Sequence, residues 1–203
     1  MAHNVDSDYV HWVCPEMRGQ LSIENLHISK SLKKAINKTS RSDNCDLSIN
    51  RDFEAVIFGC AEQTTERPES WINNSIRSVF LKLHELGKAH SVEFWQNGEL
   101  KGGLYGLAIG SAFFGESMFS RVPNASKICL VHLVARLWSG GFTLLDTQFV
   151  NDHLLQFGVY ELLHDEYQIK LNKAVMKSAD FVQQGKTQHE ILENYFQMRD
   201  RKL

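Results

Sequence analysis

The chain has 203 residues, of which 43% are hydrophobic and 23% are charged, and its formal net charge is −2. This length provides for one buried core with a short appendage and excludes two large domains. The small net charge excludes a protein that coats nucleic acid through bulk electrostatics, so any contact with RNA must be local.

The first residues predict an irregular segment to about residue 20, followed by a basic helix that begins after Ser29. Its cationic side chains recur at helical spacing on one face, at Lys30, Lys34, Lys38 and Arg41. Leu32, Ala35 and Ile36 are left to face the core. Such a basic stripe can bind phosphates, or it can be the solvated face of an amphipathic helix, which composition alone slightly favours.

Residues 45–49 alternate like a short strand, and Asp52 is the expected N-cap of the helix that follows. The buried face of that helix is predicted at Phe53, Val56, Ile57 and Cys60. Residues 63–70 predict a loop that leads to Trp71, and a further helix is expected over residues 74–86, ending at Gly87. Its inward positions are predicted to be Ile76, Val79, Phe80 and Leu83.

Three strands are expected next, because apolar segments here are separated by turn signals. Residues 90–95 and 100–109 flank Asn97 and Gly98, a pair typical of a type I′ hairpin. Residues 111–119 supply the third strand.

The second half of the chain begins with a long apolar helix, predicted from its cap at Asn124 to Gly140 and Gly141. A buried strand over residues 142–145 follows and ends in Asp146. From about residue 166 to Leu203, helical periodicity broken near Gly185 predicts two helices. Antiparallel strands, a helix and another strand together indicate an α+β fold.

Several kinds of protein are excluded by what the sequence lacks. No apolar run approaches the roughly 20 residues that span a bilayer. The segment MAHNVDSDYVHW has neither the basic start nor the apolar stretch of a signal peptide, so we expect a cytoplasmic protein. The four cysteines form no CxxC pair and the histidines form no HExxH motif, so we expect no metal.

The stretch over residues 102–152 contains isolated polar side chains within apolar, glycine-rich segments. These side chains are Glu116, Asn124, Lys127, Asp146 and Gln148. A carboxylate in a buried segment costs several kcal/mol unless it is paired or used. Glu116 and Asp146 therefore mark a candidate site, although buried carboxylates that cap turns remain the structural alternative.

Eight segments occur in an order typical of one family. They are WVCPEMRG at 12–19, LHIS at 26–29, SWI at 70–72, HELGKAHSVEFW at 84–95, GGLYG at 102–106, GESMFS at 115–120, NASK at 124–127 and DTQFVNDH at 146–153. Together they resemble the bacterial leucyl/phenylalanyl-tRNA-protein transferases. The resemblance implies an enzyme that transfers Leu or Phe, and less readily Met, from charged tRNA to an N-terminal Arg or Lys of a protein. It also implies that the product is marked for degradation through the bacterial N-degron pathway, and that no cofactor is needed.

The resemblance also carries expectations about the architecture. It implies the fold of the GCN5-related N-acetyltransferases, a mixed sheet flanked by helices, which we expect over residues 21–168, with a C-terminal helical extension over 169–203. Family members usually carry an N-terminal segment that ends in G-x-F-P-W or G-x-F-P-M and forms a wall around the terminal adenosine. We expect residues 1–20 to be the remnant of this truncated appendage, with the rest encoded upstream of Met1.

The family's motifs imply roles for the polar residues. Asp146 and Gln148 match positions that hold the acceptor amine near the donor carbonyl, and Glu116 matches one that binds the amino group or peptide of the reacting pair. Asp146 either polarises Gln148, which then draws the proton from the amine, or binds the cationic side chain of the acceptor, and the second role explains the choice of basic N-termini. All three residues could instead be structural.

The donor is expected to need an apolar pocket and an RNA-binding surface. The pocket positions that match the family are Leu104, Phe113, Leu130, Leu133, Leu137 and Leu145. Trp71 matches the ring that stacks on the terminal adenosine, a contact worth about 1 to 3 kcal/mol. The basic stripe defined above would contact phosphates of the acceptor stem without reading sequence.

Two other functions remain as alternatives. An acyl-CoA-dependent N-acetyltransferase is disfavoured because SRVPNASK stands where a Q/R-x-x-G-x-G pyrophosphate loop would precede the long helix. A non-catalytic tRNA-binding protein or degradation adaptor is disfavoured because it would not need Glu116, Asp146 and Gln148 together.

Overall fold

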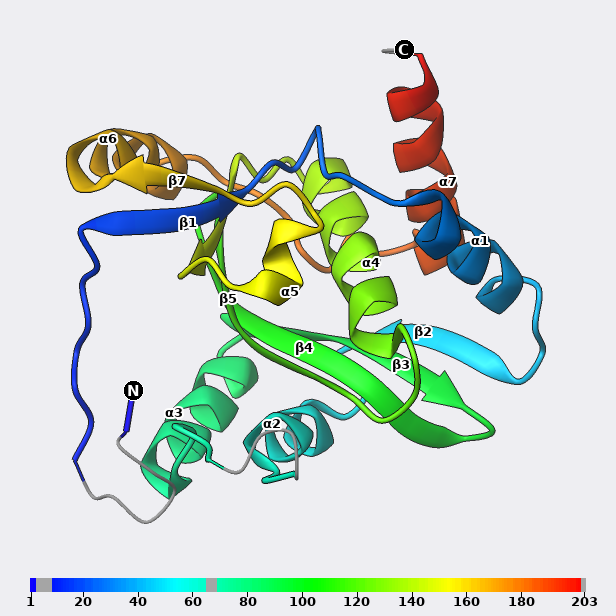
Figure 1. Ribbon diagram of the computed structural model, residues 1–203, viewed down its shortest axis with the longest axis horizontal. Coiled ribbons are helices and arrows are strands. Elements are labelled where there is room, and N and C mark those ends of the chain that lie inside the picture. Colours follow the sequence, from blue (N-terminus) through cyan, green and yellow to red (C-terminus); the bar gives the residue numbers. More distant parts are fainter. Residues whose placement is uncertain (3–8, 65–68, 202–203) are drawn as a thin grey trace.

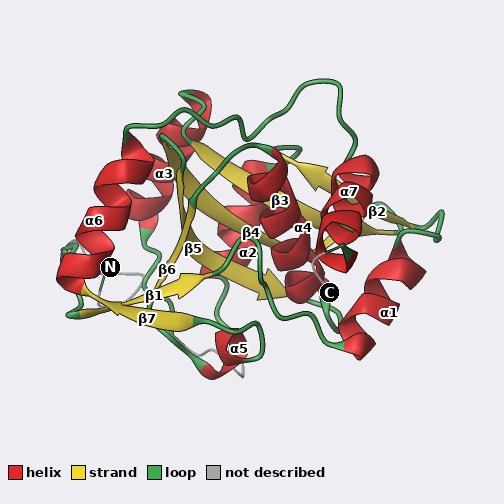
Figure 2. Ribbon diagram, turned by 90° about the horizontal axis from the view of Figure 1, so that it is seen from above, coloured by secondary structure: helices red, strands yellow, loops and turns green. Residues whose placement is uncertain are grey.

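A seven-stranded mixed sheet runs through the molecule, with helices on both of its faces (Figures 1 and 2). The computed structural model describes residues 1–2, 9–64 and 69–201. The strands are β1 (Met17–Leu21), β2 (Cys45–Ile49), β3 (Ala89–Gln96), β4 (Glu99–Ile109), β5 (Ala112–Ser120), β6 (Leu144–Gln148) and β7 (Tyr160–Leu163). The helices are α1 (Lys30–Thr39), α2 (Phe53–Ala61), α3 (Asn74–Glu85), α4 (Ala125–Ser139), α5 (Asp152–Leu155), α6 (His164–Val175) and α7 (Gln188–Asp200). The predicted α+β class is confirmed.

The strand order is β2-β3-β4-β5-β6-β1-β7. All neighbouring strands pair antiparallel except β5 and β6, which are parallel. That parallel pair is short, because only Ala112–Phe114 of β5 faces Leu144–Asp146 of β6. Beyond it, β5 continues to Ser120 while β6 continues beside β1, so the two central strands separate and leave an opening in the sheet.

Capping side chains determine where several helices begin. The side chains of Ser29, Asp52 and Asn73 accept hydrogen bonds from backbone N–H groups at the starts of α1, α2 and α3. Asn124 occupies the N-cap position of α4, as predicted, but its side chain makes no capping bond and its backbone is left-handed, with φ of 68°. Asn124 therefore forms the turn between β5 and α4 through its left-handed backbone, a conformation that asparagine adopts more readily than most residues.

The predicted hairpin is confirmed, with positive φ angles of 54° at Asn97 and 77° at Gly98 between β3 and β4. The two expected C-terminal helices are also present as α6 and α7, although residues 202–203 lie outside the described part of the chain. Part of the predicted loop over 63–70 lies outside it too, at residues 65–68.

Other element predictions were wrong. The segment expected to be irregular to residue 20 contains β1, which pairs with β6 and β7 and crosses the expected domain boundary at residues 20 and 21. The strand expected over 142–145 is β6, which begins at Leu144 and continues past Asp146. Val79 was expected inward but is 57% exposed, because α3 buries only a narrow face. β7 and α5 were not predicted.

The largest apolar core lies between the sheet and α4. Helices α7 and α1 cover the side of α4 that faces away from the sheet, so α4 is buried on nearly all sides (Figure 1). A second cluster lies on the other face, under α2 and α3. Glycines in β4 allow this close packing: an ideal Cβ on Gly102 would lie 2.5 Å from the Cβ of Ala125 in α4. None of the helices in the described ranges has the length and hydropathy needed to cross a bilayer.

Candidate active site

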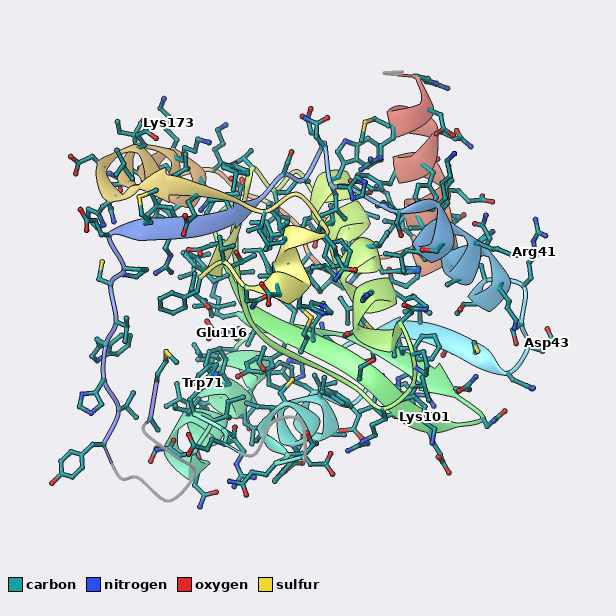
Figure 3. The ribbon with its side chains drawn as sticks, viewed as in Figure 1. Arg41, Asp43, Trp71, Lys101, Glu116 and Lys173 are labelled. Atoms are coloured by element: carbon teal, nitrogen blue, oxygen red, sulfur yellow. The ribbon has the colours of Figure 1, made fainter. Side chains whose placement is uncertain are left out.

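A cavity of about 300 Å³ lies where β5 and β6 separate. Its walls come from β4, β5, β6 and α4, from the start of α5 and from the loop that carries Trp71. The lining residues are Trp71, Leu104, Tyr105, Gly115, Glu116, Ser117, Met118, Leu130, Leu133, Leu145, Thr147, Asn151 and Leu154. Figure 3 shows Glu116 and Trp71 on the same side of the molecule. The cavity thus combines an aliphatic wall with one carboxylate and one indole ring.

Most of the predicted pocket residues meet at this cavity, namely Leu104, Leu130, Leu133 and Leu145. The other two lie outside it. Phe113 is fully buried and stacks on Phe181, with ring centroids 5.5 Å apart, and Leu137 is fully buried in the main core one helical turn beyond Leu133. Sequence periodicity predicted correctly that both are buried, but it could not tell which neighbours bury them.

Sequence reasoning missed several residues of the cavity wall, chiefly Tyr105, Met118, Thr147, Asn151 and Leu154. Tyr105 stands next to a predicted pocket residue in GGLYG, and Thr147 stands between the two predicted polar residues of β6. A buried tyrosine hydroxyl needs a partner, so this position carried a usable signal. Asn151 has a local role as well, because its side chain accepts a hydrogen bond from the backbone N–H of Leu154, at 3.0 Å.

Glu116 enters the cavity from an irregularity in β5. Tyr105 pairs with Ser117 and Gly106 pairs with Gly115, so Glu116 is an extra residue in a bulge. No hydrogen bond to its carboxylate is present within the described ranges. Burial, with a smaller contribution from the nearby charge of Asp146, raises the pKa of Glu116 to about 7 against the opposing effect of Arg18. At neutral pH this carboxyl group can therefore both accept and donate a proton.

Asp146 lies behind the cavity wall, fully buried, with hydrogen bonds to both carboxylate oxygens. The Nε atom of Arg18 lies 3.0 Å from Oδ1 and from Oδ2, and Nη2 lies 2.9 Å from Oδ2. The hydroxyl of Tyr167 donates to Oδ2, and the backbone N–H of Gln148 donates to Oδ1 at 2.7 Å. Three segments far apart in the chain, β1, β6 and α6, are joined at this one side chain.

Both side-chain donors to Asp146 stay protonated. Burial alone would lower the pKa of Arg18, but the hydrogen bonds and charge of Asp146 outweigh it, so that the pKa of Arg18 lies above its ordinary value. Burial and the hydrogen bond to Asp146 raise the pKa of Tyr167. The arrangement is a buried ion pair with a neutral donor added, which satisfies the charge of Asp146 without water.

Gln148 is half-buried, and its backbone is left-handed, with φ of 59°. Its contact with Asp146 runs through the backbone N–H rather than through the side-chain amide. Gln148 is not among the residues that line the cavity, whereas the preceding Thr147 is. A non-glycine residue in this conformation is strained, and the surrounding hydrogen bonds hold it there.

The basic stripe lies on α1 and the residues just after it, around a surface hollow of about 850 Å³. Its members Lys30, Lys34, Lys38 and Arg41 are exposed and share this hollow, as their helical spacing predicted. None of them has an ion-pair partner in the described part of the chain, whereas neighbouring Lys33 pairs with Asp200 at 3.6 Å. Figure 3 places Arg41 toward the opposite end of the molecule from Trp71.

Comparison with known proteins gives one consistent result. Residues 20–172 match the family described as leucyl/phenylalanyl-tRNA protein transferase. A protein of Paramagnetospirillum magneticum with that name is 54% identical over 181 residues, which are 89% of this chain and 85% of the relative. A namesake from Rhodopseudomonas palustris is 49% identical over 89% of this chain and 79% of its own length. A third, from Zymomonas mobilis, is 51% identical over 86% of this chain and 64% of its own length.

The fold, the cavity and these relatives define an enzyme of the aminoacyltransferase class. The chain belongs to the leucyl/phenylalanyl-tRNA protein transferase family.

Proposed function

We propose that this enzyme transfers Leu or Phe, and less readily Met, from charged tRNA to the N-terminal Arg or Lys of acceptor proteins. The modification marks the acceptor for degradation, in the cytoplasm. The observation that carries the proposal is the cavity between β5 and β6, where an aliphatic wall, the titratable Glu116 and the ring of Trp71 meet. The names of the relatives support both the charged tRNA and the protein acceptor.

The aliphatic wall is the proposed pocket for the transferred side chain. Its volume of about 300 Å³ is at the small end of ligand pockets and suits one amino-acid side chain. The predicted leucines that line it are joined by Met118 and Leu154. Met118 is an unbranched side chain that can adjust to either a branched or an aromatic guest. Phe113 and Leu137 support this wall from the core without touching the guest.

The donor tRNA is proposed to use two separate contacts. Trp71 stacks on the terminal adenosine at the cavity, and the basic stripe on α1 binds phosphates of the acceptor stem. The cations of that stripe are exposed and have no ion-pair partner among the described residues, which supports the second contact. Since the two contacts lie toward opposite ends of the molecule, the acceptor end of the tRNA must extend across the face between them.

The chemistry needs positioning more than strong catalysis, because the donor is an activated ester. An acceptor α-amine has a pKa of about 7.7 to 8.0, so roughly a tenth of it is neutral at pH 7. Holding amine and ester in attack geometry supplies on the order of 7 to 11 kcal/mol, which exceeds the effect of a general base. Glu116 is proposed to bind the incoming amine, and its pKa of about 7 suits a group that also takes up a proton.

Asp146 and Gln148 are proposed to act as one unit. The ion pair with Arg18 occupies both carboxylate oxygens of Asp146, which argues against direct binding of the acceptor's cationic side chain. The bond from the Gln148 backbone N–H to Asp146 instead favours the role in which Asp146 orients Gln148, which draws the proton from the amine.

The detailed architecture is also part of the proposal. The separation of β5 and β6 around a cavity supports a fold like that of the GCN5-related N-acetyltransferases, in a domain that includes β1 and extends to about residue 168. Residues 169–203 are proposed to be an extension of this domain rather than an independent unit, because Tyr195 is fully buried and its hydroxyl donates to the backbone oxygen of Ile23 at 2.9 Å.

The test is a transfer assay with the full chain. Phe-tRNA and Leu-tRNA carrying a labelled amino acid are mixed with peptides that begin with Arg, Lys, Asp or Ala. We expect label on the Arg and Lys peptides alone. Absence of transfer to both would overturn the proposal, and transfer from acetyl-CoA in a parallel reaction would favour the acetyltransferase. Binding of charged tRNA without any transfer would favour the adaptor.

A further inference from the structure

A second row of lysines lies on α6 and on the turn that follows this helix. Lys170, Lys173 and Lys177 are exposed, and their helical spacing places them on one face. None of them has an ion-pair partner in the described part of the chain. The ammonium group of Lys170 lies over the ring of Tyr160, 5.4 Å from its centroid. Like charges on one helix face repel, so this set, the lysine row of α6, costs stability unless an anion covers it.

The lysine row of α6 borders a surface hollow of about 600 Å³. Its other lining residues come from the end of β1 with residues 22–25, from β7 and from residues 141–145. The rings of Trp138 and Tyr160 take part in the lining, and Glu24 is the one acidic residue among the lining residues that the structure describes. The hollow therefore combines net positive charge with aromatic rings, which is typical of surfaces that bind nucleic acid.

This hollow adjoins the one beside the basic stripe of α1. Glu24 and Asn25 line it and also line a third hollow, of about 270 Å³. Lys33 lines the third hollow and also the hollow at the basic stripe. Figure 1 shows the chain between β1 and α1 running along this side of the molecule, and Figure 3 places Lys173 and Arg41 toward opposite ends. One surface therefore connects the two sets of cations.

The cations in the middle of this surface are bonded within the fold. Lys33 pairs with Asp200 at 3.6 Å, and a guanidinium nitrogen of Arg199 donates to the backbone oxygen of Leu26. The cations without an ion-pair partner among the described residues thus lie at the two ends, in the basic stripe of α1 and in the lysine row of α6. A small anion would occupy one end, whereas an extended polyanion can reach both.

We propose that the lysine row of α6 binds the phosphate backbone of the same tRNA that the basic stripe of α1 binds. The inference rests on the proposed function and adds a third contact to its RNA surface. RNA is the partner that fits, because it carries a negative charge at every nucleotide and lysines bind phosphates without reading sequence. An acidic segment of the acceptor protein is disfavoured, because the proposed acceptors begin with a basic residue, which the lysine row would repel.

The test measures the binding of Phe-tRNA to the double variant Lys170→Ala with Lys173→Ala and to the wild type, both as full chains, at several salt concentrations. We expect the affinity at low salt to fall about tenfold, and the slope of log K against log salt to become shallower by about 1.4 to 1.8, the value for two lost phosphate contacts. The urea midpoint should stay the same, because both side chains are exposed. At saturating Phe-tRNA, kcat should stay within about twofold of the wild type, because these lysines lie outside the proposed reaction centre.

The double variant Lys82→Ala with Lys101→Ala is the matched control. It removes the same charge from lysines that pair with Glu85 and Glu99. Figure 3 shows Lys101 far from Lys173. We expect this control to keep the slope of the wild type. An equal change of slope in both double variants would be an effect of net charge alone and would overturn the inference, as would a wild-type slope in the variant of α6.

Two acceptor peptides separate RNA from protein as the partner. Both begin with Arg, and one continues with acidic residues and the other with neutral residues. We expect the KM of each peptide to be the same for the α6 variant and the wild type. If the variant raises the KM of the acidic peptide alone and binds Phe-tRNA as the wild type does, the inference is overturned while the proposed function stands. If the wild type transfers nothing, the proposed function fails, and the binding measurements still decide whether the lysine row of α6 contacts RNA.

Discussion

Glu93 and Glu116 are carboxylates in the same sheet with opposite surroundings. Glu93, on β3, is fully buried and accepts four hydrogen bonds, from the hydroxyls of Ser48 and Ser91, the indole N–H of Trp95 and the backbone N–H of Asp52. Glu116, on β5, has no such bond within the described ranges. The chain satisfies the first carboxylate with its own donors and leaves the second without one among the described residues, as the proposed binding of the acceptor amine by Glu116 requires.

Asp146 combines properties of both. Its carboxylate is as fully satisfied as that of Glu93, but one of its donors is the charged Arg18 and another is the backbone of the strained Gln148. Its charge also raises the pKa of Glu116. Asp146 therefore belongs to the fold by its contacts and to the site by its electrostatic effect, and substitutions there should disturb both.

The largest effect is expected for Asp146→Asn. The substitution leaves the part-buried guanidinium of Arg18 without its counter-charge, and breaking a buried ion pair in this way costs about 3 to 5 kcal/mol. Transfer should fall to background, because the amide leaves only one accepting oxygen for the donors of Arg18, Tyr167 and Gln148, which disturbs the orientation of Gln148. Urea unfolding and the transfer assay measure the two effects separately.

The double variant Arg18→Met with Asp146→Asn distinguishes the two roles of Asp146. Removing both charges should restore part of the lost stability, because no buried charge is left uncompensated. Transfer should stay at background. Recovery of transfer along with stability would show that Asp146 acts through folding alone and belongs with Glu93.

Glu116→Gln should reduce kcat by about 10²-fold, the lower range for a positioned acid or base. In the wild type we expect kcat/KM to rise with pH through about 7 as Glu116 ionises, in addition to the rise from the acceptor amine. The variant should keep only the rise from the amine. A variant with the wild-type profile would contradict the role of Glu116 as the group that receives the amine.

The same substitution should affect stability in a pH-dependent way. The pKa of Glu116 in the folded state is raised from 4.5 to about 7, so the folded state binds the proton more tightly than the unfolded chain. This contribution to stability is fully present below pH 4.5 and is lost as the pH rises through about 7. Glu116→Gln should therefore be more stable than the wild type at pH 8 and lose this advantage at pH 5, as measured by urea unfolding.

The fold could be predicted where short segments determine it. Ser29, Asp52 and the Asn97-Gly98 turn act on residues within a few positions, and each element they predicted is present. β1 was missed because only distant partners make it a strand. Its neighbours are β6 and β7, and Arg18 meets Asp146 across 128 positions of the chain.

The candidate site was predicted in part for a similar reason. A carboxylate in an apolar run marked Glu116 and Asp146 as candidates, but the same pattern occurs at Glu93 in HSVEFW, which is satisfied within the fold. The sequence cannot tell these carboxylates apart, because the difference lies in donors such as Ser48 and Arg18 from other strands.

Glu93→Gln tests the structural side of the comparison. The amide replaces one accepting oxygen with a donor that faces other donors, so we expect a loss of about 2 to 3 kcal/mol in the free energy of unfolding. At a temperature where the variant remains folded, kcat should match the wild type within about twofold. A large fall in kcat there would mean that Glu93 is not purely structural, and the comparison with Glu116 would lose its basis.

The smallest effect on activity is expected for Lys33 and Lys34 on the surface of α1. Like Glu93 and Glu116, they are one side chain with partners in the fold and one without. Lys33 pairs with Asp200 and lies over the ring of Phe196, whereas Lys34 has no ion-pair partner in the described part of the chain. Lys34→Ala should weaken the binding of charged tRNA a few-fold and reduce the slope of log K against log salt by about 0.7 to 0.9, while Lys33→Ala should change the slope less. If the slope for Lys34→Ala equals that of the wild type, Lys34 does not contact a tRNA phosphate. If Lys33→Ala changes the slope more than Lys34→Ala does, a lysine of α1 that has an ion-pair partner can still contact the tRNA.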